Sequence, residues 1–84
     1  MSILSAVEIS MYPLTGDYLT LIQAFIDRLN TYPELVVRTN SLSTQVWGTL
    51  DRVMAILAAE IERSATTGPQ LVFVMKVLPG LAPP

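Results

Sequence analysis

The sequence predicts an α+β domain in which two helices cover one face of a four-stranded antiparallel sheet. Three observations predict this class. Two segments repeat apolar residues with the period of a helix, and four shorter segments are rich in β-branched residues or alternate apolar and polar side chains. The third observation is their order: strand, helix, strand, strand, helix, strand, with a very short connection between the middle pair. A chain of 84 residues has room for one domain.

The first strand is predicted over residues 3–12. From Ala6 onward apolar and polar side chains alternate, which is typical of a strand with one dry face and one wetter face. The dry face holds Val7, Ile9 and Met11, and the wetter face holds Glu8, Ser10 and Tyr12. Pro13 has no backbone N–H to donate to a ladder and ends the strand.

The first helix is predicted over residues 18–31, and Asp17 stands where its side chain can accept from the first free N–H groups. Apolar residues at spacings of four, three and four form one stripe, which we interpret as a core face. The stripe holds Tyr18, Ile22, Phe25 and Leu29, and it is widened by Leu19, Leu21 and Ile26. Pro33 stops the helix, because the residue before a proline avoids the helical region.

Two short strands are predicted next, over residues 35–39 and 43–48. The first is rich in β-branched residues, and Asn40 and Ser41 favour the bend that follows it. In the second of these strands Gln45 and Trp47 point to one side of the sheet, and Thr44 and Val46 point to the other.

The second helix is predicted over residues 50–64, with Thr49 or Asp51 in position to cap it. Its apolar stripe holds Leu50, Val53, Met54, Leu57 and Ile61. The last strand, residues 70–78, is a nearly continuous apolar run interrupted only by Lys76. Such a composition predicts a strand that is covered on both faces.

This order of elements is that of the ferredoxin-like βαββαβ fold. We expect a single domain over residues 1–78 and a Pro-rich C-terminal tail over residues 79–84. In this fold the first and third strands are neighbours at the centre of the sheet. The face opposite the helices is then expected to hold Glu8, Ser10, Tyr12, Gln45 and Trp47.

Composition excludes several classes of function. There is no Cys and no His, which removes disulfides, thiol catalysis, structural zinc and the usual proton shuttle at neutral pH. The net charge is −2 and the five basic residues are scattered, so nucleic acid is not an expected partner. No apolar run approaches the roughly 20 residues of a membrane helix. The start of the chain lacks the basic region of a signal peptide, so we expect a cytoplasmic protein. The sequence shows no nucleophile–base pair, so we do not expect an enzyme.

The apolar content predicts self-association. Hydrophobic residues make up 51% of the chain and charged residues only 14%, against roughly 25% charged in an average soluble domain. A small monomer cannot hide that much apolar surface, so we expect a homodimer or homotetramer. Trp47 is the expected interface anchor.

Two stretches resemble the small thiamine-binding protein family, also called YkoF-like. Its members close the first strand with S-x-Y-P-L, which is matched here by Ser10, Tyr12, Pro13 and Leu14. They carry T-N-x-M-S-T-x-V-x-G across the second hairpin, matched here by Thr39, Asn40, Ser43, Thr44, Val46 and Gly48. Leu42 stands where Met is commoner. The resemblance covers residues 6–77 and implies a ferredoxin-like fold, assembly into dimers or tetramers, and binding of thiamine or its hydroxymethylpyrimidine part by at least some members.

The candidate ligand-binding residues are Glu8, Ser10, Tyr12, Asn40, Ser43, Thr44 and Gln45. Hydroxyl and amide groups match the donors and acceptors along a pyrimidine edge, and Glu8 can neutralise a cationic ligand or accept from an exocyclic amine. No metal and no further cofactor is expected. Two alternatives stay open: the first-strand residues are polar spacers on a wet sheet face, and Asn40 only forms a turn. In that case the protein is a homo-oligomeric interaction module with no small-molecule ligand.

Overall fold

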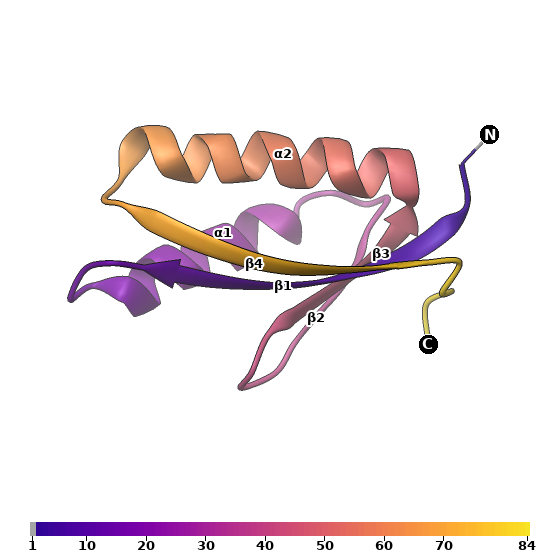
Figure 1. The fold of residues 1–84 in the computed structure, drawn as a ribbon, viewed down its shortest axis with the longest axis horizontal. Helices are drawn as coiled ribbons and strands as arrows, with labels where there is room; N and C mark the ends of the chain where they lie inside the picture. The colour runs from indigo at the N-terminus through magenta and orange to yellow at the C-terminus, as the bar shows by residue number, and fades with distance from the viewer. Residues whose placement is uncertain (1) are drawn as a thin grey trace.

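A computed structural model describes residues 2–84, with position 67 described by its backbone alone. The elements in chain order are β1 (Leu4–Pro13), α1 (Tyr18–Leu29), β2 (Val36–Thr39), β3 (Thr44–Thr49), α2 (Leu50–Thr67) and β4 (Leu71–Pro79). All neighbouring strands are antiparallel, and they form one four-stranded sheet in the order β2-β3-β1-β4 (Figure 1). The predicted ferredoxin-like α+β fold is therefore confirmed.

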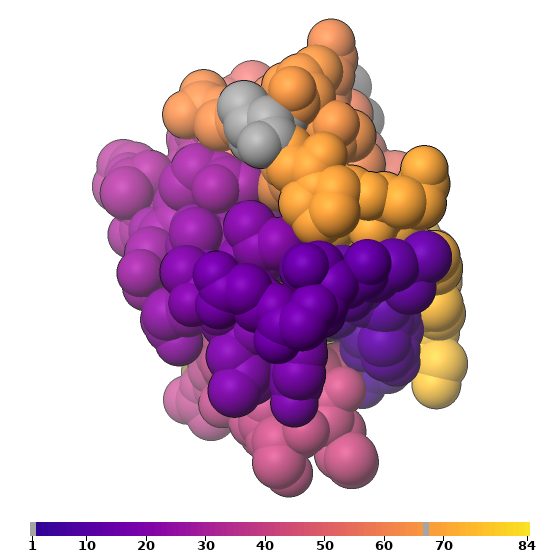
Figure 2. Space-filling model, turned by 90° about the vertical axis from the view of Figure 1, so that its left-hand side faces the viewer, coloured from indigo at the N-terminus to yellow at the C-terminus, as the bar shows by residue number. Residues whose placement is uncertain are grey.

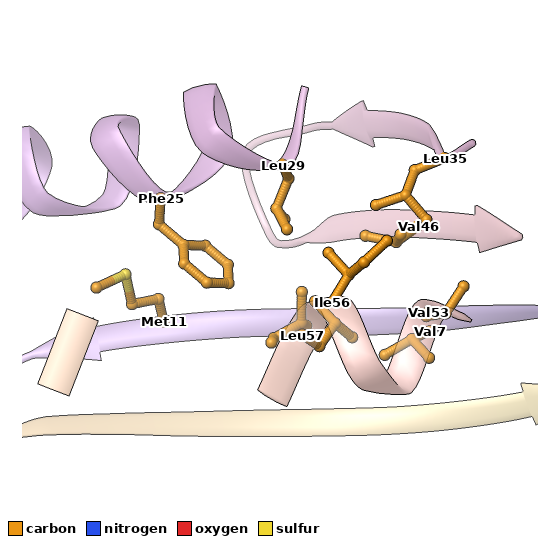
Figure 3. Close-up of a cluster of buried hydrophobic side chains, with 10 residues drawn as sticks. Val7, Met11, Phe25, Leu29, Leu35, Val46, Val53, Ile56 and Leu57 are labelled. Atoms are coloured by element: carbon orange, nitrogen blue, oxygen red, sulfur yellow. The ribbon is translucent and has the colours of Figure 1, made fainter. Parts of the chain in front are cut away.

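The hydrophobic core lies between the sheet and the two helices. Val7, Ile9 and Met11 alternate along β1 and are buried, as predicted from the period of two. They meet a cluster from both helices and from β3, drawn in Figure 3, whose members include Phe25, Leu29, Val46, Val53, Ile56 and Leu57. Because side chains of both helices join this one cluster, both helices cover the same face of the sheet.

The α1 stripe is a core face only in its second half. Phe25 and Leu29 are buried, but Tyr18 at the start of the helix is 48% exposed and Leu19 is 67% exposed. The first turn of α1 therefore lies beyond the packed core, and this position matters for the groove described below.

The helix caps differ from expectation. Asp17 precedes α1, but its backbone is not extended (φ −94°, ψ 43°) and its side chain makes no capping hydrogen bond, so that prediction was wrong. Thr49 makes no capping bond either. At the start of α2 the N–H of Asp51 donates to Ser2 Oγ at 3.0 Å, and Asp51 Oδ1 accepts from the N–H of Arg52 at 2.8 Å.

β4 corrects a second prediction, because its apolar side chains are not covered on both faces. The strand lies at the edge of the sheet, beside β1 only, and most of its residues are exposed in the single chain. Its large exposed residues are Val72, Val74, Met75, Val77 and Leu78. A continuous apolar run indicates that a strand needs cover, but it does not say that the same chain supplies that cover. The strand also runs through Pro79, one residue beyond its predicted end.

A buried carboxylate joins the two helices. Glu60 of α2 is 1% exposed and accepts from Arg28 Nε and from the Tyr32 hydroxyl, each at 2.6 Å. Ser64 accepts from Arg28 Nη2 at 2.6 Å. Burial alone raises the pKa of the Glu60 carboxyl, but these two hydrogen bonds and the charges of Arg63 and Arg28 outweigh it and hold the pKa below its usual range.

Candidate ligand-binding groove

A groove of about 700 Å³ opens at one end of the sheet. Its walls are the last residues of β1, the helix α1 from Tyr18 to Ile26 and the turn between β2 and β3. Figure 2 looks at this end of the molecule, where the indigo and purple chain of β1 and α1 meets the pink hairpin.

The groove exists because β1 is longer than its neighbour β3. The ladder between them runs from the pair Leu4 and Thr49 to the pair Ile9 and Thr44 and then stops. On its other side β1 stays paired with β4 as far as Pro13 and Leu71. Residues 10–13 therefore have a strand neighbour on one side only, and the space that β3 would have filled is open.

The hairpin wall is held in shape by Asn40. Its Oδ1 accepts from the N–H groups of Leu42 at 2.8 Å and Ser43 at 3.0 Å, and its own N–H donates to the Ser43 carbonyl at 3.0 Å. This is the local side-chain bonding that makes Asn a turn former, so the predicted turn role of Asn40 is confirmed. Because Oδ1 is used twice, the remaining hydrogen-bonding capacity of this side chain is that of its Nδ2 group, which is a donor.

Five of the seven candidate residues line the groove, namely Ser10, Tyr12, Asn40, Ser43 and Thr44. Thr44 is 6% exposed, and its hydroxyl lies 3.2 Å from that of Thr39. The Ser10 hydroxyl donates to the Leu42 carbonyl at 3.4 Å, which connects β1 to the tip of the hairpin. Tyr12 is 52% exposed at the mouth.

Glu8 and Gln45 lie outside the groove. They face each other across the β1–β3 ladder on the side of the sheet away from the core, further along the strands. Glu8 Oε1 lies 3.6 Å from Lys76 Nζ, its neighbour on β4. The seven candidates therefore divide between two places, and a role of Glu8 and Gln45 in ligand binding stays a prediction.

Trp47 also lies on the face away from the core, between Ala6 of β1 and Val36 of β2. Only 8% of Trp47 is exposed, and its Nε1 is buried without a hydrogen-bond partner among the described residues. The tail after β4 turns toward this side of the sheet (Figure 1). The interface role of Trp47 stays a prediction.

The apolar wall of the groove was missed from the sequence. It is made by Leu14, Tyr18, Leu19, Ile22 and Ile26, with Leu42 on the opposite side. Four of these side chains, Leu14, Tyr18, Leu19 and Leu42, are exposed large hydrophobic residues. One signal was available, since α1 carries more apolar residues than one core stripe requires, but we interpreted all of them as core.

The groove carries no formal charge. Among the described residues that line it there is no Asp, Glu, Lys or Arg, and its polar groups are hydroxyls, side-chain amides and main-chain atoms. Nor does any group of three or more His, Cys, Asp or Glu residues within residues 2–84 form a candidate metal site. No described helix is both long and apolar enough to cross a membrane.

Comparison with known proteins shows the fold. No family model and no curated protein matches the chain. Among solved structures, protein SP2199 from Streptococcus pneumoniae has 20% identity and a TM-score of 0.84 over 94% of this chain and 89% of that one. A candidate thiamine biosynthesis/salvage protein (TM0486) from Thermotoga maritima has 14% identity and a TM-score of 0.80 over 89% and 82%. A domain of unknown function (DUF77) from Bacillus cereus has 16% identity and a TM-score of 0.79 over 100% and 85%.

Proposed function

We propose that this protein is a cytoplasmic, non-catalytic carrier or sensor that binds thiamine or its hydroxymethylpyrimidine part in the groove. The observation that supports this most is that residues of both resemblance motifs line the same groove. All four residues of the first resemblance motif line the groove, together with Thr39, Asn40, Ser43 and Thr44 of the second. The compartment and the lack of catalysis are proposed from the sequence alone.

The size and chemistry of the groove suit a small heterocycle. Pockets for small molecules typically measure about 300–1,000 Å³ and combine apolar walls with a few polar groups. Here the apolar side chains of α1 face a wall of hydroxyl and amide groups, which match a pyrimidine edge without any charge. The rings of Tyr12 and Tyr18 give aromatic faces at the mouth, for stacking or for a thiazolium cation.

The groove also predicts which form of the ligand is rejected. A phosphate group binds well where Arg, Lys or a helix N-terminus neutralises it, and an uncompensated charge in an apolar site is costly. No lining residue in the described chain is basic, and the start of α1, which lines the groove at Tyr18, offers only a partial positive charge against the full charges of a diphosphate. We therefore propose that thiamine diphosphate is a poorer ligand than thiamine or the pyrimidine alcohol.

Thermal unfolding with each compound tests the proposal. We expect hydroxymethylpyrimidine and thiamine to raise the Tm in a concentration-dependent way. At a ligand concentration of 100 Kd the free energy of unfolding should rise by about 2.7 kcal/mol. Thiamine diphosphate should raise the Tm less. No stabilisation by any of the three at millimolar concentration would rule the function out.

A second candidate function is a homo-oligomeric interaction module, and the edge strand β4 favours it. Its exposed apolar residues and its outer edge, which has no strand neighbour among residues 2–84, are features that promote pairing with another chain. Lys76 lies beside Glu8 of its own chain, so the edge presents little net charge to a second copy. We propose that two β4 strands pair antiparallel. The two functions are compatible, because the groove lies on the other side of β1 from β4.

A further inference from the structure

We propose that the main chain of Met11 is the polar anchor of the groove, and that the ligand is a planar ring carrying a hydrogen-bond acceptor beside a donor, as a 4-aminopyrimidine does. This inference rests on the proposed function and goes further, because it says which edge of the ligand is recognised and by which atoms.

The hydrogen bonds at the ends of β1 fix the direction of its main-chain groups. The N–H of Leu14 donates to the Gln70 carbonyl beside β4, and the carbonyl of Ile3 accepts from Leu50 next to β3, both at 2.9 Å. In a strand the N–H and C=O of one residue point to the same side, and those of the next residue point to the other. Odd-numbered residues of β1 therefore face β3, and the main chain of Met11 points into the space where β3 is missing.

The residue that would have paired with Met11 is engaged elsewhere. The register that pairs Ile9 with Thr44 would place Leu42 opposite Met11. Instead the Leu42 N–H donates to Asn40 Oδ1, and its carbonyl accepts from the Ser10 hydroxyl. The N–H and C=O of Met11 are thus left without a strand partner among the described residues, at a position that lines the groove. The side chain of Met11 is only 8% exposed, so these polar groups lie beside the apolar core.

This position suits a small ring better than a peptide. The next residue of β1 that faces the same way is Pro13, which has no N–H. The open edge therefore offers one complete donor and acceptor pair, whereas strand addition depends on several successive pairs. A 4-aminopyrimidine carries a ring nitrogen that accepts beside an amine that donates, which complements the N–H and C=O of one strand residue.

The test is a titration of the ¹⁵N-labelled full chain, followed by amide NMR, with hydroxymethylpyrimidine and with the same pyrimidine lacking its amino group. We expect the Met11 amide to shift and to become protected from hydrogen exchange. The Glu8 amide is the internal control, because by the same alternation it already faces β4, at a residue outside the groove, and it should change little. The analogue without the amine leaves the Met11 carbonyl unpaired, and we expect it to bind about tenfold more weakly or worse.

A control variant outside the groove separates ligand binding from general effects of mutation. Val36→Ala changes an exposed strand residue that does not line the groove, so we expect its affinity for hydroxymethylpyrimidine to stay within about twofold of the original. If the ligand binds but the Met11 amide does not respond, or if the analogue without the amine binds equally well, the inference is wrong and the proposed function stands. If neither compound binds, both fail. Ligand-induced changes in amide signals that are confined to the outer edge of β4 would also overturn it.

Discussion

At the scale of single residues, the clearest energetic feature is the Glu60 carboxylate. It is 1% exposed, and Arg28, whose side chain is 27% exposed, is its closest charged partner. Removing one partner of a buried ion pair leaves the other charge uncompensated, and this usually costs several kcal/mol. The bonds that Glu60 makes to Arg28 and Tyr32 therefore hold the end of α1 and the segment after it against α2.

We predict that Glu60→Gln lowers the free energy of unfolding at pH 7 by about 3 kcal/mol, measured by urea denaturation. The folded-state pKa of Glu60 is lowered, so its stabilisation is complete above the unfolded pKa of about 4.3 and is lost as the pH falls through the folded pKa. The original protein should thus lose stability on acidification below about pH 4.3, and Glu60→Gln should lose less. Glu62→Gln, an exposed neighbour on α2, is the matched control and should change little. Equal losses for the two variants would contradict this role.

At the scale of elements, β4 and β1 explain the two open surfaces. At one end β1 extends beyond β3, and this extension forms one wall of the groove. β4 is an apolar edge strand with no neighbour on its outer side in the described chain. By the alternation fixed at Gln70, the even-numbered residues of β4 bond to β1 and the odd-numbered residues face outward. Met75 is one of the outward residues, so its N–H is not used by its own sheet.

We predict that the protein is a dimer or tetramer at micromolar concentration and that Met75→Pro shifts it toward the 9.2 kDa monomer, as measured by sedimentation equilibrium. Proline is tolerated on an edge strand where its missing N–H faces solvent, so circular dichroism should show an intact fold. Lys76→Pro is the control that should unfold the chain, because the N–H at that position faces β1. A monomeric original protein would contradict the pairing of β4 strands.

The elements themselves were predictable, because each has a local cause. Alternation along β1, the apolar stripes of the helices and the Asn40 turn all appear within a few residues of sequence, and the predicted bounds differ from the structure by at most three residues. The helix caps could not be predicted, because they depend on parts of the chain that are distant in sequence. Asp17 has the right residue type for a cap but not the backbone conformation, and Ser2, far away in sequence, bonds to the start of α2 instead.

The candidate site was predictable in part for the same reason. The polar residues on both sides of the groove are close to turn and strand ends, which sequence locates well. The split between Ser10 and Glu8 depends on where β3 stops pairing, and the exposure of Leu19 depends on how far α1 reaches beyond the core. Both are properties of the assembled sheet, and no local pattern reports them.

At the scale of the whole molecule, the excess of apolar residues noted in the composition is not spread evenly. One group of exposed hydrophobic residues surrounds the groove and consists of Tyr12, Leu14, Tyr18, Leu19 and Leu42. A second group follows β4 and consists of Val72, Val74, Met75, Val77 and Leu78. We therefore propose two separate binding functions for these patches, one for a ligand and one for a second copy.

Calorimetric titration of hydroxymethylpyrimidine into the original protein, Tyr12→Ala and Val36→Ala tests the groove most directly. Tyr12 is at the groove mouth, whereas Val36 is a comparably exposed strand residue outside it. Loss of an aromatic contact costs about 1 kcal/mol beyond area, so we predict that Tyr12→Ala weakens binding about tenfold or more while Val36→Ala binds like the original. Absence of binding heat in the original protein, or equal affinities for all three, would contradict ligand binding in this groove.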